Sequence, residues 1–263
     1  MRLHTVDTPA DVALVAGGIV AEFIRRAPGS ALGLATGGSV IGLYAELRRA
    51  VQAGEISCGD LRAFLLDEYV GLPAAHPQSY RRFIREHLSD HVDLDERRVF
   101  GLDGIAPDAD VEALRYERLV VAANVGLQIV GIGSNGHLAF NEPGSSLDSV
   151  TRVVTLSEVT RRANARFFAV DEEVPSLVLT QGVGTIMRAE TIVLVAFGEN
   201  KAAAVASALR GPVTSDVPAS ALQQHPDVIV VIDRAAAARL GDDGHASLVR
   251  RASAGSDRTT ARW

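Results

Sequence analysis

Short apolar runs alternate with longer amphipathic segments along almost the whole of this 263-residue chain. The apolar runs predict strands at residues 32–35, 62–66, 127–132, 191–197 and 228–232. The amphipathic segments predict helices at residues 9–26, 39–53, 78–88, 108–124 and 199–209. This alternation is typical of βα units around a parallel sheet. We therefore predict an α/β fold with a mostly parallel, doubly wound sheet and helices on both faces.

The chain has the size and composition of one globular domain. Of its residues, 47% are hydrophobic and 22% are charged, which suits a single large core. No internal repeat or low-complexity linker divides it. From Arg234 onward the apolar pattern fades into Ala-rich and then Ser, Gly and Arg-rich sequence. We predict a single domain over residues 1–240 and a mobile tail over residues 241–263.

Charge and cysteine content exclude several classes of protein. The net charge is −6 and no long basic run is present, so we expect no nucleic-acid partner. The single cysteine, Cys58, rules out an internal disulfide. The apolar stretch from Val12 to Ala21 is short and has no basic leader, so we expect no signal peptide, no membrane partner and a cytoplasmic location. A small anionic metabolite stays open, because positive charge can gather in one pocket.

The first candidate site is a glycine-rich loop between a predicted strand and a predicted helix. Thr36, Gly37, Gly38 and Ser39 follow the strand at residues 32–35. Glycines let backbone amides approach a ligand, and a helix N-terminus offers unpaired N–H groups and the positive end of a dipole. The loop suits an anion such as phosphate, although many βα turns use glycine only to turn. This segment alone leaves both interpretations open.

Two carboxylates follow the second predicted strand. Asp67 and Glu68 come directly after residues 62–66, and open α/β sheets bind ligands at the carboxyl ends of their strands. An acid at that edge can move a proton. A helix cap or a solvated acid pair is the alternative interpretation.

The third candidate segment is a polar loop that glycines punctuate. Residues 131–144 are Gly-Ile-Gly-Ser-Asn-Gly-His-Leu-Ala-Phe-Asn-Glu-Pro-Gly and follow a predicted strand. His137 can exchange protons near neutral pH while neighbouring side chains orient its ring. A lone histidine is more often structural, but the glycines and polar side chains of this loop favour function.

Lys201 is the only lysine among the 26 Lys and Arg residues. Genome composition explains a preference for arginine, but a bias this complete marks Lys201 as a position where arginine does not serve. A surface lysine on a solvated helix face is the alternative interpretation.

Five segments, taken together and in order, resemble the signature set of the glucosamine-6-phosphate deaminase family. They are residues 34–39, 66–69, 131–144, 180–185 and 198–202. The resemblance runs from about residue 32 to residue 233, and the string from Gly131 to Gly144 is highly specific.

The resemblance implies a set of catalytic residues. Asp67 would move a proton between C2 and C1 of the open-chain sugar, and His137 would open the ring. Asn135 and Glu142 would orient His137. The C2–H of an amino sugar becomes acidic only in the open-chain aldehyde, so ring opening must come before proton transfer and loss of ammonia. The resemblance implies no metal and no organic cofactor, and no Cys or His cluster in the sequence has metal-ligand spacing.

The resemblance also implies how a small-molecule sugar phosphate is held. Its phosphate would rest on residues 36–39, with positive charge from Arg166 and Lys201. Residues 157 to about 175 would form a movable lid. Assembly into a homo-oligomer stays open.

Two positions depart from the family pattern. Relatives often carry aspartate where this chain has Asn135, so stabilising the His137 cation would fall to Glu142. In allosteric members a lysine lies two residues after the arginine that matches Arg152, and this chain has Val154 there. We therefore expect no activation by N-acetylglucosamine 6-phosphate.

Three other functions fit parts of the sequence. A 6-phosphogluconolactonase shares the fold but needs no C2 proton shuttle, so Asp67 and the Asn-Glu-Pro-Gly ending favour the deaminase. A galactosamine-6-phosphate deaminase differs at C4 of its substrate, which the sequence does not resolve. A catalytically silent phosphosugar sensor would keep the phosphate site and lose turnover, which the presence of Asp67 and His137 disfavours.

Overall fold

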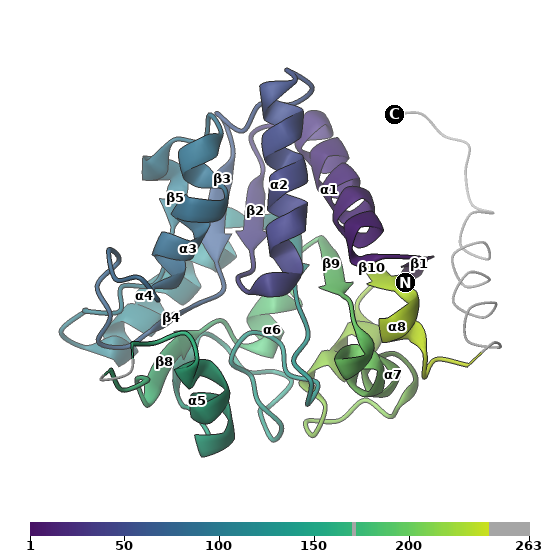
Figure 1. Ribbon diagram of the computed structural model, residues 1–263. Coiled ribbons are helices and arrows are strands. Elements are labelled where there is room, and N and C mark those ends of the chain that lie inside the picture. Colours follow the sequence, from purple (N-terminus) through teal and green to yellow (C-terminus); the bar gives the residue numbers. More distant parts are fainter. Residues whose placement is uncertain (170–171, 242–263) are drawn as a thin grey trace.

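The computed structural model describes residues 1–169 and 172–241 and contains two sheets (Figure 1). The main sheet has seven strands, all pairing in parallel, in the order β1-β10-β9-β6-β2-β3-β5. A small antiparallel sheet has the order β4-β8-β7. The predicted tail, residues 241–263, lies outside the described residues except for Gly241.

The strands at the centre of the main sheet are almost completely buried, because helices cover both faces of a parallel sheet. The main-sheet strands are β1 (Arg2–Val6), β2 (Ala31–Leu34), β3 (Arg62–Leu65), β5 (Val99–Phe100), β6 (Val125–Val130), β9 (Thr191–Ala196) and β10 (Val228–Asp233). The small sheet consists of β4 (Asp67–Tyr69), β7 (Arg152–Thr155) and β8 (Leu177–Thr180).

Helices connect these strands. The α-helices are α1 (Pro9–Arg26), α2 (Gly38–Gln52), α3 (Tyr80–His87), α4 (Ala109–Ala123), α5 (Glu158–Ala165), α6 (Val183–Ile186), α7 (Ala202–Arg210) and α8 (Arg234–Ala237). Short 3₁₀ helices are η1 (Ser89–His91), η2 (Glu96–Arg98), η3 (Glu199–Lys201) and η4 (Pro218–Gln224). Within the described ranges, no helix combines the length and apolarity needed to cross a membrane.

The order of the main strands fixes where a ligand can bind. From β2 the chain moves outward to β3 and β5, whereas from β6 it moves the opposite way to β9 and β10. Parallel crossovers are right-handed, so this reversal places helices on opposite faces, and α1 and α2 lie side by side on one of them (Figure 1). The doubly wound α/β prediction is confirmed. The reversal falls between the neighbours β2 and β6, and ligands of such sheets bind at the carboxyl ends beside it.

Each predicted strand and helix matches an element of the structure to within two residues at each end, except that α7 begins three residues after the start of the helix predicted at 199–209. At the start of α1, Thr8 is the cap: its side chain accepts the N–H of Asp11, while the Asp11 carboxylate accepts the N–H of Thr8, and Pro9 takes the first helical position. The first turn of the predicted helix at 199–209 is the 3₁₀ helix η3. The edge strands β1 and β5 of the main sheet, the small sheet and the helices α5, α6 and α8 were not predicted.

Candidate active site

Four neighbouring strands of the main sheet bring the predicted site residues other than Arg166 to one edge. In sheet order these strands are β9, β6, β2 and β3. At their carboxyl ends lie the turn that leads to Lys201, the loop that carries His137, the loop at residues 36–39, and Asp67. Segments that lie up to 165 residues apart, from Thr36 to Lys201, therefore meet at the topological switch point.

Asp67 is a buried carboxylic acid. Its side chain follows β3 and is 6% exposed, and its Oδ1 has no hydrogen-bond partner among the described residues. Burial raises the pKa of Asp67 well above its ordinary value, and the negative charge of Glu68 raises it further. A raised pKa makes the carboxylate a stronger base, as a group that takes a proton from carbon requires.

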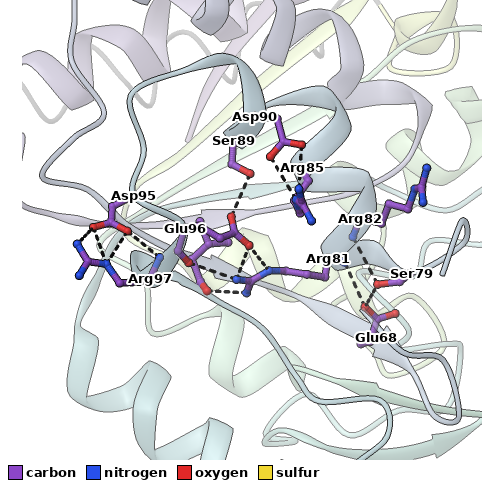
Figure 2. A network of polar contacts seen from close by, with 11 residues as sticks. Glu68, Ser79, Arg81, Arg82, Arg85, Ser89, Asp90, Asp95, Glu96 and Arg97 are labelled. Carbon is purple, nitrogen blue, oxygen red and sulfur yellow. Dashed lines mark hydrogen bonds and ion pairs between the residues drawn. The ribbon is translucent and has the colours of Figure 1, made fainter. Parts of the chain in front are cut away.

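Glu68 is also buried, but unlike Asp67 it is surrounded by hydrogen-bond donors. Its carboxylate accepts the N–H groups of Tyr69, Tyr80 and Arg81 and the hydroxyl of Ser79, at 2.7–3.1 Å. Figure 2 shows this carboxylate beside Ser79, at the start of α3. Burial raises the pKa of Glu68, and these four donors act in the other direction. Glu68 is therefore a helix-capping acid, so the capping interpretation holds for Glu68 and not for Asp67.

The loop at residues 36–39 leads directly into α2. Gly37 has a φ of +97°, in the left-handed region that glycine adopts without strain. No side chain within the described part of the chain caps α2, and its first turn contains no acid. The first N–H groups of this helix are thus available to an anion, as the sequence predicts.

Gly133 shapes the space that His137 occupies. A Cβ atom at position 133 would lie 2.3–2.4 Å from Cε1, Nδ1 and Nε2 of the imidazole, so the ring packs directly on the glycine backbone. The N–H of Gly133 donates to the carbonyl of His137 at 3.0 Å. Asn135 accepts the backbone N–H of His137 on its Oδ1 at 3.3 Å, and so orients the loop that carries the ring.

The surroundings of His137 favour the neutral form of its imidazole. Burial lowers its pKa, the positive charge of Lys201 lowers it further, and the negative charge of Glu142 opposes both. Its Nδ1 is buried and makes no hydrogen bond to any described residue. A neutral imidazole has one nitrogen that donates and one that accepts, so it can exchange a proton with a ligand.

Glu142 contacts a different part of the chain. Its Oε1 accepts the hydroxyl of Ser157 at 3.1 Å and the hydroxyl of Thr160. Both hydroxyls belong to the first turn of α5, since Ser157 is its N-cap. Within the described residues no hydrogen bond joins Glu142 to His137; their interaction is electrostatic.

The two predicted phosphate cations have unequal positions. Lys201 donates from Nζ to the carbonyl of Ile132 at 2.7 Å, and burial lowers its pKa. An ammonium group has three protons, so two remain for a ligand. Arg166 lies at the C-terminal end of α5, and its guanidinium stacks over the ring of Phe167 at 4.7 Å. The structure thus brings Lys201 to the sheet edge beside His137, and leaves Arg166 exposed on α5.

Two supporting residues had no separate role in the sequence analysis. The hydroxyl of Thr180 accepts the N–H of Phe140 at 3.2 Å, and Thr180 pairs with Asp67 across β8 and β4. The amide of Gln181 donates to the carbonyl of Leu65 at 2.9 Å. Both lie in the 180–185 segment of the family signature, which marks their importance without indicating these contacts. No group of three or more His, Cys, Asp or Glu residues in the described ranges could hold a metal ion.

Known proteins resemble this chain over most of its length. The family model for glucosamine-6-phosphate isomerases and 6-phosphogluconolactonase matches residues 10–230. A glucosamine-6-phosphate deaminase of Rhodococcus jostii is 50% identical over 241 residues, which cover 91% of this chain and 93% of the relative. A glucosamine-6-phosphate deaminase of Corynebacterium glutamicum is 46% identical over 239 residues, which cover 91% of this chain and 94% of that relative.

Solved structures show the same fold. A monomeric glucosamine-6-phosphate deaminase superposes with a TM-score of 0.88 at 42% identity, covering 91% of this chain and all of that one. The 6-phosphogluconolactonase of Trypanosoma brucei superposes with a TM-score of 0.72 at 21% identity, covering 91% of this chain and 98% of that one, and shows the fold alone. With its sheet, its signature segments and these relatives, the chain belongs to the glucosamine-6-phosphate isomerase and 6-phosphogluconolactonase family, among the glucosamine-6-phosphate deaminases.

Proposed function

We propose that this protein is a glucosamine-6-phosphate deaminase, which converts glucosamine 6-phosphate and water into fructose 6-phosphate and ammonia in the breakdown of amino sugars. The relatives of 46–50% identity carry this name over nearly the whole chain. The observation that best supports the chemistry is the buried carboxyl group of Asp67, whose Oδ1 has no partner among the described residues, at the same sheet edge as His137.

Ring opening is the first step of the proposed reaction. The neutral imidazole of His137 accepts the proton of the C1 hydroxyl, and the imidazolium then gives this proton to the ring oxygen as the bond between C1 and the ring oxygen breaks. Glu142 contributes negative charge that stabilises the imidazolium, and Asn135 holds the backbone of the loop. The product of this step is the open-chain aldehyde.

Proton transfer at carbon is the second step. The Asp67 carboxylate removes the C2 proton, which leaves an enolamine, and returns a proton to C1, which leaves an imine at C2. Water adds to the imine, and ammonia leaves. Two carboxylates side by side thus have separate tasks, since Glu68 is occupied by four donors and Asp67 is not.

The phosphate of the substrate binds, in this proposal, to the N–H groups at the start of α2 and to the ammonium of Lys201. Arg166 supplies further charge when the segment from residue 157 to about 175 closes over the substrate as a lid. The start of α2 and Lys201 lie at the switch point, which supports their part in binding the phosphate. Arg166 lies at the end of α5, so a movement of α5 can carry it to the substrate.

The test is release of ammonia by the purified protein. We expect ammonia from glucosamine 6-phosphate without added metal, and the same rate in the presence of EDTA. Galactosamine 6-phosphate, tested alongside, decides the preference at C4. Hydrolysis of 6-phosphogluconolactone without deamination would overturn the proposal, and binding of the sugar phosphate without turnover would indicate a sensor.

Assembly and location form a separate part of the proposal. The homo-oligomer that the sequence leaves open gains no support from the similar solved deaminase, which is monomeric. Light scattering on the purified chain distinguishes a monomer from an oligomer. We also propose a cytoplasmic location, which suits the single buried thiol of Cys58 and the sugar-phosphate substrate.

A further inference from the structure

The carboxylate of Glu142 is held by one oxygen only. Both α5 hydroxyls, those of Ser157 and Thr160, donate to Oε1. Oε2 makes no hydrogen bond to any described residue. Hydrogen bonds to a charged acceptor are stronger than those between neutral groups, so two of them fix the orientation of a carboxylate.

Ser157 and Thr160 also hold one another. The Oγ of Ser157 accepts the backbone N–H of Thr160 at 3.2 Å and lies 3.2 Å from its hydroxyl. This is the N-cap of α5, so the two hydroxyls keep their places as long as the first turn of the helix is intact. The positive end of the helix dipole at this turn favours the negative charge of Glu142.

The body of α5 is fixed to β4, the strand that begins with Asp67. Asn164 donates from its side-chain amide to the hydroxyl of Tyr69 at 2.9 Å, and Tyr69 lies two residues after Asp67, in β4. Arg161 donates to the carbonyl of Val174 on the far side of the segment, at 3.1–3.2 Å. Through these contacts α5 lies between the Asp67 strand and the loop that ends in Glu142.

We propose that Ser157 and Thr160 are positioning residues for the reaction: they hold one oxygen of Glu142 and aim the other at the imidazole of His137. The proposal rests on the proposed function, because Glu142 matters in this way only if His137 opens the sugar ring. It also gives α5 two tasks, since its N-terminal end sets the orientation of Glu142 while its C-terminal end carries Arg166.

A pair of substitutions at Thr160 separates the hydroxyl from the shape of the side chain. Thr160→Val keeps the shape and removes the donor, whereas Thr160→Ser keeps the donor. We expect Thr160→Val to lower kcat on the order of tenfold, as for the loss of one hydrogen bond to a charged group, with KM changed by less than about twofold. Thr160→Ser should restore most of kcat.

Thr155→Val is the matched control. It makes the same chemical change at an exposed position at the end of β7, outside the catalytic and binding groups, and should leave both kinetic constants unchanged. If Thr160→Val does not fold, as judged by circular dichroism, Thr160→Ala removes the same hydroxyl and replaces it in every comparison.

A double-mutant cycle with Glu142→Gln tests whether Thr160 acts through Glu142. If it does, Thr160→Val costs little further activity once the carboxylate has been removed, so the two effects are far from additive. Additive losses of kcat would indicate a merely structural role of the α5 cap and overturn the proposal.

The outcomes also separate this inference from the function on which it rests. A wild-type protein that releases no ammonia from glucosamine 6-phosphate refutes the proposed function. An active wild type with an equally active Thr160→Val variant leaves the function intact and refutes the positioning role.

Discussion

The two halves of the candidate site are held by different means. One half lies on the main sheet, where Lys201 is fixed by a backbone carbonyl and His137 by direct packing on Gly133. In the other half, Glu142 is bound by side chains of α5, and α5 is bound to β4 by a side-chain contact with Tyr69. The half fixed by backbone keeps its geometry without the ligand, whereas the half fixed by side chains can be released.

The two halves of the site also pack on apolar cores of different size. The large core contains the buried side chains of the main sheet and its covering helices. The α5 side packs on a small separate cluster made of Tyr69, Leu72, Phe140, Leu156, Phe168, Val174 and Val178. Because a small cluster buries less apolar area, opening it costs less free energy than opening the large core. Changes on the main-sheet side should therefore have the largest effects on turnover, and changes around α5 smaller ones.

The largest effect is expected at Asp67. Asp67→Asn removes the proton shuttle and should lower kcat about 10²- to 10⁴-fold, the usual range for a general acid or base, while the substrate still binds. Steady-state kinetics and calorimetric titration with glucosamine 6-phosphate measure the two properties. A variant with near-normal turnover would show that Asp67 is not the shuttle.

Lys201 should have the next largest effect. Lys201→Ala is expected to weaken substrate binding by about 1.5–3 kcal/mol, the range for a hydrogen bond to a charged group, or roughly tenfold to a hundredfold in KM. Lys201→Arg should also be impaired, because the broad guanidinium would not fit where a compact ammonium donates to the Ile132 carbonyl and, in the proposed function, also binds the substrate phosphate. An Arg variant with the wild-type KM would make the single lysine an accident of composition.

The stability of variants should distinguish the two neighbouring carboxylates, Asp67 and Glu68. The pKa of Asp67 is raised in the folded state, so the fold holds this proton more tightly than the unfolded chain does, and wild-type stability falls as pH rises from the ordinary value of 3.8 through the folded pKa. Asp67→Asn lacks this loss and should become more stable than the wild type with rising pH. Urea unfolding at several pH values measures the difference.

Glu68→Gln is the control for that experiment. An amide cannot replace a carboxylate that accepts four hydrogen bonds, so this variant should lose about 1–3 kcal/mol of stability. Equal behaviour of the two variants would contradict the division of roles between Asp67 and Glu68.

Tyr69→Phe probes the α5 side with a smaller expected effect. The change removes the hydroxyl that accepts the Asn164 amide and should cost about 1 kcal/mol of α5 docking, seen as a rise of a few fold in KM with kcat nearly unchanged. A fall in kcat as deep as that of Asp67→Asn would show that the two halves do not act separately.

No effect is expected from N-acetylglucosamine 6-phosphate. Val154, in the middle of β7, offers no charge to the phosphate of an effector. Substrate saturation curves with and without this compound should coincide. A sigmoidal curve that becomes hyperbolic in its presence would refute the prediction.

Five strands of the main sheet could be predicted because they are buried on both faces. Such strands appear as continuous apolar runs, for example residues 191–196, and each is followed by a helical pattern. The two edge strands were not predicted: β1 alternates exposed and half-buried residues, and β5 has only two residues. The small sheet has no comparable pattern: β4, β7 and β8 are three or four residues long, and β4 pairs with a strand more than a hundred residues away. Pairing over that distance depends on tertiary packing, which no local window of sequence contains.

The site could be predicted to a similar degree. Glycine loops and acids at strand ends indicate the residues at the switch point, since these positions follow from topology. Sequence left open whether Asp67 or Glu68 was a cap, because that depends on where α3 begins in space. The contact between Glu142 and Thr160 joins a loop to a helix that the pattern did not predict, so sequence gave no indication of it.

Gly133 makes room for the His137 imidazole because it lacks a Cβ atom. Any side chain at this position would overlap three atoms of the His137 imidazole and displace the ring, although the backbone there does not require glycine for its own conformation. The imidazole thus occupies the space that a methyl group at this position would fill. A saturation screen for activity would rank Gly133 with the acid and base residues, and a design that transplants this histidine to another scaffold must transplant the glycine with it.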